Sequence, residues 1–212
     1  MYPKFIKRFF DLIITLLLLI LLSPLFLLIA MACCIAFNGK VFFIQPRVGK
    51  NEQIFNIIKF ISMKPPGKNE AEIIEDSLRL TATGKFLRKL SLDELPQLIN
   101  VLNGEMSLIG PRPLLIKYLP FYSAAEKIRH SVRPGITGLA QVNGRNSLTW
   151  DERLKYDISY VQNLSLSLDL KIFLTTIYYF LAAKNVNVDP RSALPDLDVE
   201  RSKINGDNEM KL

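Results

Sequence analysis

Residues 89–113 read KLSLDELPQLINVLNGEMSLIGPRP, and the fold of the chain is inferred from this stretch outward. It joins an adjacent acid pair, Asp93 and Glu94, to an apolar segment and then to a rigid turn at residues 110–113. Ser91 followed three residues later by Glu94 is the pattern of a helix capping box, and the apolar residues after it continue a helical face. The pattern predicts both carboxylates in the first turn of a helix, where free N–H groups and the helix dipole favour negative charge.

Pro96 leaves two registers open for this helix. If Ser91 caps it, Pro96 falls at the fifth helical position and costs a hydrogen bond there. If Asp93 is itself the cap, Pro96 falls within the first turn, where proline is tolerated. In both registers Asp93 is expected to be ionised at a helix N-terminus, a place that also attracts phosphate.

Cations flank the acid pair on both sides. An S-x-x-E pattern is most often only a cap, but here Arg88 and Lys89 precede it and Arg112 follows in the Gly-Pro-Arg-Pro turn. Carboxylates beside fixed cations suit an anionic substrate and a divalent metal. A glycosidase pair needs carboxyls on either side of a sugar, whereas neighbours in one turn share a side.

The composition favours an anionic partner. The 212 residues make one domain plus an appendage, and 27 Lys+Arg against 20 Asp+Glu give a net charge of +7. Such a balance fits nucleic acid, anionic lipid or a phosphorylated substrate. Nucleic acid fits least, because the sequence has no helix-turn-helix, zinc or RNA-binding signature. Cys33 and Cys34 lie together in an apolar run and form no disulfide framework or metal site, which indicates a reducing, cytoplasmic location.

The N-terminal segment, residues 1–38, is expected to enter a membrane. Basic residues precede an uncharged apolar run at residues 12–37, which is too long for a signal peptide. A straight transmembrane helix is the default for such a run. Ser23 and Pro24 interrupt it, however, and leave legs of roughly 16 and 20 Å, each shorter than a hydrocarbon core of about 30 Å.

Both flanks of the run are basic, which places both ends on the cytoplasmic side. The sequence therefore favours a re-entrant membrane helix-break-helix with its break at Ser23 and Pro24, and a kinked span is the alternative. Asp11 is expected to pair with Arg8 or to cap the membrane helix.

The remaining elements give an α+β, mostly helical fold, with a catalytic domain at residues 39–186. Two β-type runs, 41–45 and 53–60, joined by residues 46–52, predict a β-hairpin, and Lys59 at its end can turn toward the acid pair. The sequence then predicts a surface loop or short exposed helix, a helix, and a helix or pair broken at a proline, followed by two further helices. The second of these is apolar and aromatic, as in an interfacial amphipathic helix. The segments are, in that order, 64–76, 81–90, 114–131, 150–164 and 164–183.

Three further features of the sequence are a Gly- and Arg-rich stretch, a single histidine and a polar tail. Glycines and arginines at residues 133–146 are a weak signal for a pyrophosphate-binding loop, in which backbone N–H groups and guanidinium groups would bind the phosphates. His130 sits among Arg129 and Arg133, where a structural or phosphate-contacting role is more expected than a general base. The tail, residues 187–212, is polar and expected to be disordered.

These pieces together resemble the bacterial sugar transferase family, the monotopic phosphoglycosyl transferases. Each motif is weak alone, but the ordered set is specific and runs from Lys7 to about Val186. The motifs are Lys7-Arg8-x-x-Asp11, Ser23-Pro24, Arg47-Val48-Gly49, Lys59-Phe60, residues 92–97, Gly110-Pro111-Arg112-Pro113, residues 133–138 and Val142-Asn143-Gly144-Arg145. The chain looks closest to the minimal members that handle a UDP-linked diacetamido sugar in N-glycan initiation.

The resemblance implies a two-step transfer. Asp93 would attack the β-phosphorus of a UDP-sugar and release UMP, and polyprenyl phosphate (undecaprenyl phosphate) would then take the phosphosugar from the enzyme. Glu94 would orient the metal or assist proton transfer, and both acids would hold Mg²⁺. The residues expected to bind substrate phosphates or the nucleotide are Lys59, Arg88, Arg112, Arg133 and Arg145.

The same resemblance implies partners and a location. It implies membrane lipids and downstream glycosyltransferases as partners, no nucleic acid, and the cytoplasmic face of the bacterial inner membrane. A non-catalytic, membrane-anchored protein that binds lipid phosphates is the alternative, and in that case the arginines would carry the whole function.

Overall fold

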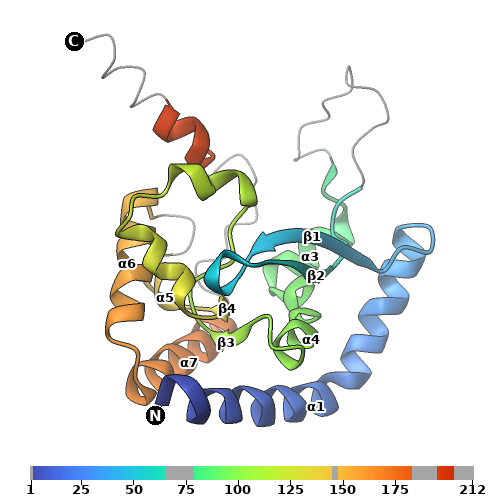
Figure 1. Cartoon of the computed structure of the whole chain (residues 1–212). Helices are drawn as coiled ribbons and strands as arrows, with labels where there is room; N and C mark the ends of the chain where they lie inside the picture. The colour runs from blue at the N-terminus through green and yellow to red at the C-terminus, as the bar shows by residue number, and fades with distance from the viewer. Residues whose placement is uncertain (1, 65–78, 145–147, 183–194, 203–212) are drawn as a thin grey trace.

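The computed structural model, shown in Figure 1, describes residues 2–64, 79–144, 148–182 and 195–202. Its described part is mostly helical with two small sheets, which agrees with the predicted α+β class. The described α-helices and β-strands are α1 (Lys7–Ala36), β1 (Phe42–Val48), β2 (Ile54–Phe60), α3 (Ala82–Lys89), α4 (Gln97–Leu102), β3 (Ser107–Ile109), β4 (Gly135–Thr137), α5 (Leu139–Asn143), α6 (Trp150–Gln162) and α7 (Leu166–Leu181). The predicted loop at residues 64–76 falls almost wholly outside the described residues.

Helix α1 continues through Pro24 instead of breaking there. It runs beneath the rest of the molecule and bends upward in its second half (Figure 1). Pro24 has no N–H to give to the carbonyl of Ile20, and the Ser23 hydroxyl donates to that oxygen instead, at 2.8 Å. The predicted helix break at Ser23 and Pro24 is therefore wrong. The helix continues past Pro24, and the Ser23 hydroxyl satisfies the carbonyl that the proline leaves without a partner. Whether the bent helix re-enters a membrane stays a prediction.

The outer surface of α1 is apolar and fits membrane association. Within the described residues it is the one helix that is long and apolar enough to cross a membrane, and 11% of its most apolar stretch is buried. Helix α7 adds exposed Leu170, Leu174 and Tyr178, as expected for an interfacial helix.

The inner face of α1 carries a polar stripe that joins the helix to the domain. Lys7, Asp11 and Thr15 follow one another at four-residue spacing and are all buried. The Asp11 carboxylate accepts hydrogen bonds from the Ser107 hydroxyl at 2.8 Å and from the Leu108 N–H at 3.1 Å. The expectation that Asp11 pairs with Arg8 or caps the membrane helix is thus wrong, because β3 offers it closer donors.

Arg8 and Lys7 join α1 to two further helices. The Arg8 guanidinium donates to the carbonyl oxygens of Val101 and Leu102, at 2.7 and 3.1 Å, at the C-terminal end of α4. Such a cation satisfies carbonyls that have no partner within the helix. Lys7 forms an ion pair of 2.7 Å with Asp169 of α7.

The predicted β-hairpin is confirmed, with a longer first strand than expected. Strands β1 and β2 pair antiparallel from Phe42 opposite Phe60 to Val48 opposite Ile54. The predicted loop began at Pro46, yet the strand continues through it. A hairpin of two strands has two edges, and a proline is tolerated at an edge because alternate N–H groups point away from the partner. Lys59 lies on β2, as predicted.

A short parallel pair of strands, β3 and β4, was not predicted. Gly135 lies against Gly110 so closely that a Cβ on Gly135 would be 2.1 Å from the Gly110 nitrogen. The Gly110 N–H donates to the Thr137 oxygen, and the Gly135 N–H donates to the Pro111 oxygen. The glycines therefore serve close backbone packing. This corrects the predicted pyrophosphate-binding stretch at Gly135, since the N–H of that residue is already used.

The segment at residues 114–131 forms two 3₁₀ helices, η4 (Ile116–Phe121) and η5 (Glu126–Ser131), in place of the predicted amphipathic helices. Pro120 lies inside η4 and does not divide the segment. The predicted helices after it are confirmed as α6 and α7.

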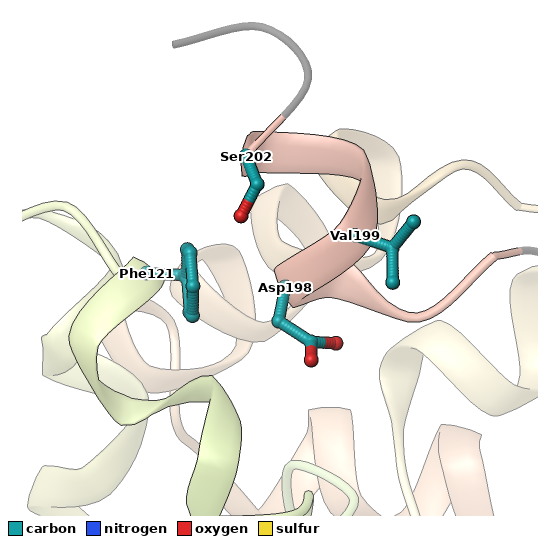
Figure 2. Close-up of a pocket in the computed structure, with 4 residues that line it drawn as sticks. All are labelled: Phe121, Asp198, Val199 and Ser202. Atoms are coloured by element: carbon teal, nitrogen blue, oxygen red, sulfur yellow. The ribbon is translucent and has the colours of Figure 1, made fainter. Parts of the chain in front are cut away.

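Residues 195–202 of the tail are packed, which corrects the expected disorder there. Leu197 is fully buried, and the Trp150 indole N–H donates to the Pro195 oxygen at 2.8 Å. Asp196 also accepts hydrogen bonds from Lys117 at 2.6 Å and from the Tyr118 hydroxyl at 2.7 Å, and Arg201 pairs with Glu126 at 2.7 Å. A pocket of about 440 Å³ lies beside this segment. Its lining residues, Phe121, Asp198, Val199 and Ser202, are drawn in Figure 2, and none of them is a predicted site residue.

Candidate active site

The acid pair lies in a 3₁₀ turn, η3 (Leu92–Glu94), just ahead of α4. Ser91 has a φ of 53° in the left-handed region and its side chain caps nothing. A capping residue needs extended backbone, so the predicted capping box is wrong. Helix α4 begins at Gln97, directly after Pro96. Both predicted registers fail, because proline suits the start of a helix better than its interior.

Glu94 is held by two cations. Lys59 Nζ lies 2.7 Å from Glu94 Oε1, and Arg112 Nη2 lies 2.7 Å from the same oxygen. Arg112 Nη1 approaches Oε2 at 3.5 Å. Burial by itself would raise the pKa of Glu94, but the charges of Arg112 and Lys59 outweigh it and hold that pKa well below its usual range. Glu94 is therefore an ionised anchor for Lys59 and Arg112.

Asp93 is placed differently from its neighbour. Its residue is 8% exposed, and among the described residues no group donates a hydrogen bond to its carboxylate. Burial raises the pKa of Asp93, and the charge of Glu94 raises it further, while Lys59, Arg88 and Arg112 oppose the shift. Asp93 is thus the more basic acid of the pair and the one whose carboxylate accepts no hydrogen bond from the described residues.

Arg88 reaches the site from α3. The Thr81 side chain caps this helix by accepting from the Gly84 N–H at 3.0 Å. A Cβ on Gly84 would be 1.8 Å from the Ser62 oxygen, so glycine lets α3 cross closely over the chain that follows β2. Arg88 Nε then donates to Ser62 Oγ at 3.0 Å. The guanidinium lies where its charge stabilises the ionised form of Asp93.

Arg112 is positioned by a buried ion pair that sequence reasoning missed. Arg129 Nη2 donates to the Arg112 carbonyl at 2.7 Å, and the same guanidinium pairs with Asp157 of α6 at 2.8 Å. The side chains of Arg129 and Asp157 are 2% and 3% exposed. In the sequence Arg129 was noticed only as a neighbour of His130. No spacing rule links it to an aspartate on a helix that follows a Gly-rich loop.

Of the two remaining predicted phosphate-binding residues, the structure describes only Arg133, which does not reach the acid pair. Arg133 Nε donates to the Gly104 oxygen at 2.7 Å, beyond the far end of α4, and Arg145 lies outside the described residues. His130 is buried, packs edge-on against Tyr122, and lies 3.6 Å from Glu52. Burial and then the charge of Arg129 lower the pKa of His130 to about 4, which fits the structural role.

The residues present fit a magnesium ion that substrate phosphates complete. Within the described residues no group of three His, Cys, Asp or Glu side chains is placed to hold a metal. Magnesium commonly takes only one or two carboxylates together with phosphates and water. Asp93 and Glu94 would supply such a pair, although Lys59 and Arg112 already contact the Glu94 oxygens, and magnesium at this site stays a prediction.

Comparison with protein families gives a match to the bacterial sugar transferase family over residues 2–183. The chain belongs to this family. Two similar proteins are the sugar transferase EpsL of Bacillus subtilis and the exopolysaccharide production protein ExoY of Sinorhizobium fredii. EpsL is 43% identical over 85% of this chain and 90% of its own length, and ExoY is 42% identical over 81% and 83%.

A third relative of this transferase carries a substrate in its name. It is the UDP-glucose:undecaprenyl-phosphate glucose-1-phosphate transferase of Klebsiella pneumoniae, 42% identical over 81% of this chain but over only 39% of the relative's own length. The resemblance stated from the sequence is confirmed at the level of the family. The assignment to the N-glycan subgroup stays a prediction.

Proposed function

We propose that this transferase moves a sugar phosphate from a UDP-sugar to undecaprenyl phosphate through a covalent adduct on Asp93. The observation that carries the proposal is the contrast within the acid pair. Lys59 and Arg112 hold Glu94, whereas no described donor holds the buried and more basic Asp93. A nucleophile needs a free electron pair, and its neighbours need to offset the charge of the phosphate that it attacks.

The two steps balance without an added reactant. In the first, an Asp93 carboxylate oxygen bonds to the β-phosphorus, the bond from that phosphorus to the bridging oxygen breaks, and UMP leaves with the electron pair. In the second, a lipid phosphate oxygen bonds to the same phosphorus and the bond to Asp93 breaks. The acyl phosphate conserves the free energy of the phosphoanhydride, so the lipid receives an equivalent bond.

The cations account for most of the rate enhancement in this mechanism, because they offset the negative charge of the phosphates. Lys59 and Arg112 are fixed by Glu94, so they need no rearrangement as the reaction proceeds. Arg88 acts from the side of Asp93. Magnesium, when bound at the acid pair, supplies further positive charge to the phosphates.

The proposed setting is the cytoplasmic face of the bacterial inner membrane. The exposed apolar faces of α1 and α7 support membrane association, and a lipid phosphate lies at the membrane surface. Membrane lipids and downstream glycosyltransferases remain proposed partners. For the sugar, the resemblance points to a diacetamido sugar, while the Klebsiella relative is named for UDP-glucose.

The test is a single-turnover reaction without lipid. Incubation with a panel of UDP-sugars, including UDP-glucose and a UDP-diacetamido sugar, should give one equivalent of UMP and a phosphosugar mass on the peptide that contains Asp93. D93N should form no adduct, E94Q should form it slowly, and D151N, an exposed aspartate, should match the wild type. An adduct on D93N would refute the assignment. If none of the UDP-sugars in the panel released UMP, the result would favour the alternative, a non-catalytic protein that binds lipid phosphates.

A further inference from the structure

Arg88 of α3 is held differently from the other two cations of the site. Its Nε donates to Ser62 Oγ at 3.0 Å, and its Nη2 donates to the Met63 sulfur at 2.8 Å. Within the described residues no carboxylate pairs with Arg88, whereas the Glu94 carboxylate pairs with both of the others. A hydroxyl and a thioether are neutral acceptors, so they hold the guanidinium group without offsetting its charge.

Both contacts use the same edge of the planar guanidinium group of Arg88, the edge formed by Nε and Nη2. The N–H donors of arginine lie in a rigid fork, so fixing one edge also fixes the direction of the other. No described residue accepts a hydrogen bond from Nη1 of Arg88. The end of the fork formed by Nη1 and Nη2 is therefore the part that can bind two oxygens of a phosphate.

The segment that carries the two acceptors follows β2 directly and is held by backbone hydrogen bonds at both ends. The Ile61 N–H donates to the Val41 oxygen at 2.9 Å, and the Lys64 N–H donates to the Arg79 oxygen at 2.9 Å. Ser62 itself is buried. A group held on fixed backbone needs no rearrangement when a substrate binds, so the acceptors can orient Arg88 in advance.

The same segment and the end of α3 bring Arg88 to the acid pair. Lys59, which contacts Glu94 at 2.7 Å, lies three residues before Ser62, at most about 11 Å along the chain. The Ser91 N–H donates to the Arg88 carbonyl at 3.0 Å, and the Glu94 N–H donates to the Ser91 oxygen at 3.3 Å. Helix α3 and β2 both contact η3. Arg88 is therefore fixed beside the turn that carries the two acids.

We propose that Ser62 and Met63 are positioning residues for Arg88. They hold it as neutral acceptors, so that its whole charge acts on the phosphate that Asp93 attacks. This inference rests on the proposed function. Glu94 fixes two cations but offsets part of their charge, and an acid in place of Ser62 would do the same to Arg88. Neutral acceptors orient the cation and leave its effect on the phosphate undiminished.

The first experiment follows the Nε–H proton of Arg88 by NMR in the full-length protein, its signal being identified by its absence in R88M. In S62A this proton should exchange with water about tenfold faster or more, the range expected for a lost hydrogen bond to a charged group. S62T keeps the hydroxyl and should restore slow exchange. S167A removes an exposed hydroxyl from α7 and should leave the rate unchanged. Wild-type exchange in S62A would overturn the anchoring role of Ser62.

The second experiment compares S62N with S62D, which are nearly equal in size and differ by one negative charge. Thermal unfolding first checks that both are folded. Single-turnover UMP release should be about tenfold slower or more in S62D than in S62N, because the added acid offsets the charge of Arg88. In an R88M background the two variants should differ much less. An equal ratio in both backgrounds would show that the acid acts without Arg88, and it would overturn the proposal.

The third experiment asks whether both acceptors act through Arg88. S62A should slow UMP release about tenfold, and M63L should slow it less, because a thioether is a weaker acceptor than a hydroxyl. Neither should slow it further in R88M, whereas a merely structural role would cost as much in either background. M106L, a core substitution of the same kind, should leave the rate unchanged.

Two outcomes separate this inference from the proposed function. Wild-type UMP release in folded S62A and M63L would overturn the positioning roles and leave the function intact. No UMP release from the wild type itself would refute the function, whereas protection of the Arg88 Nε–H that depends on Ser62 would still establish the anchor.

Discussion

Replacing Arg129 with methionine should destabilise the protein and slow it at once, for two separable reasons. The substitution leaves Asp157, whose side chain is 3% exposed, buried without its partner. Breaking such a pair from one side costs about 3–5 kcal/mol, a large part of a typical stability of about 5–15 kcal/mol. It also removes the 2.7 Å hydrogen bond to the Arg112 carbonyl, which fixes the turn that carries Arg112.

The double variant R129M/D157L tells these effects apart. Removing both charges restores much of the stability, because replacing a buried ion pair by apolar residues is often close to neutral. It does not restore the donor to the Arg112 carbonyl. We therefore expect recovery of more than half of the lost unfolding free energy, while UMP release stays about 10- to 100-fold below the wild type, as for a misplaced catalytic group.

The assay combines denaturant unfolding with single-turnover UMP release in the same detergent. K117M, which breaks the exposed contact with Asp196, serves as the stability control and should change the unfolding midpoint little. A double variant that regained activity together with stability would refute the positioning role of Arg129. A single variant as stable as the wild type would refute the reasoning about the buried pair.

Excess EDTA should stop UMP release and added Mg²⁺ should restore it, because the proposed magnesium site would consist of the acid pair and the substrate phosphates; full turnover in EDTA would contradict this. Replacing Ser23 and Pro24 by Ala and Leu should straighten α1 into a span, so cysteine labelling from outside intact cells should reach one end of the helix in the variant and neither end in the wild type. The pKa of His130 is lowered to about 4 in the folded protein. As the pH falls, the unfolded state therefore binds a proton at His130 before the folded state does, so the free energy of unfolding decreases between about pH 6.5 and about pH 4. H130Q should lose less unfolding free energy than the wild type over that range, by on the order of 2 kcal/mol, and an equal loss would exclude His130 as the cause.

Local patterns predicted the elements that local forces determine. The hairpin, α3, α6 and α7 follow from short-range periodicity, and the acid pair with Lys59, Arg88 and Arg112 came together as expected. The capping box failed because its pattern describes side chains only, while the left-handed backbone of Ser91 depends on how η3 packs.

Such local patterns do not predict tertiary contacts. The pairing of β3 with β4 needs two three-residue segments separated along the chain, and neither has a periodicity of its own. The Arg129–Asp157 pair likewise joins residues that only the fold brings together. The ordering of residues 195–202 likewise depends on tertiary contacts, because Leu197 is fully buried and Arg201 pairs with Glu126.

The polar stripe of α1 bears on how a water-soluble form of this enzyme can be made. Deleting residues 1–38 would remove Lys7, Arg8 and Asp11. Asp169 would lose its ion-pair partner, the C-terminal end of α4 would lose its cation, and the Ser107 hydroxyl would lose an acceptor. A soluble enzyme would instead keep the whole helix and exchange its outward leucines, such as Leu17, Leu21 and Leu28, for polar residues. In protein engineering terms, the anchor is part of the folding unit, and only its outer surface is free to be redesigned.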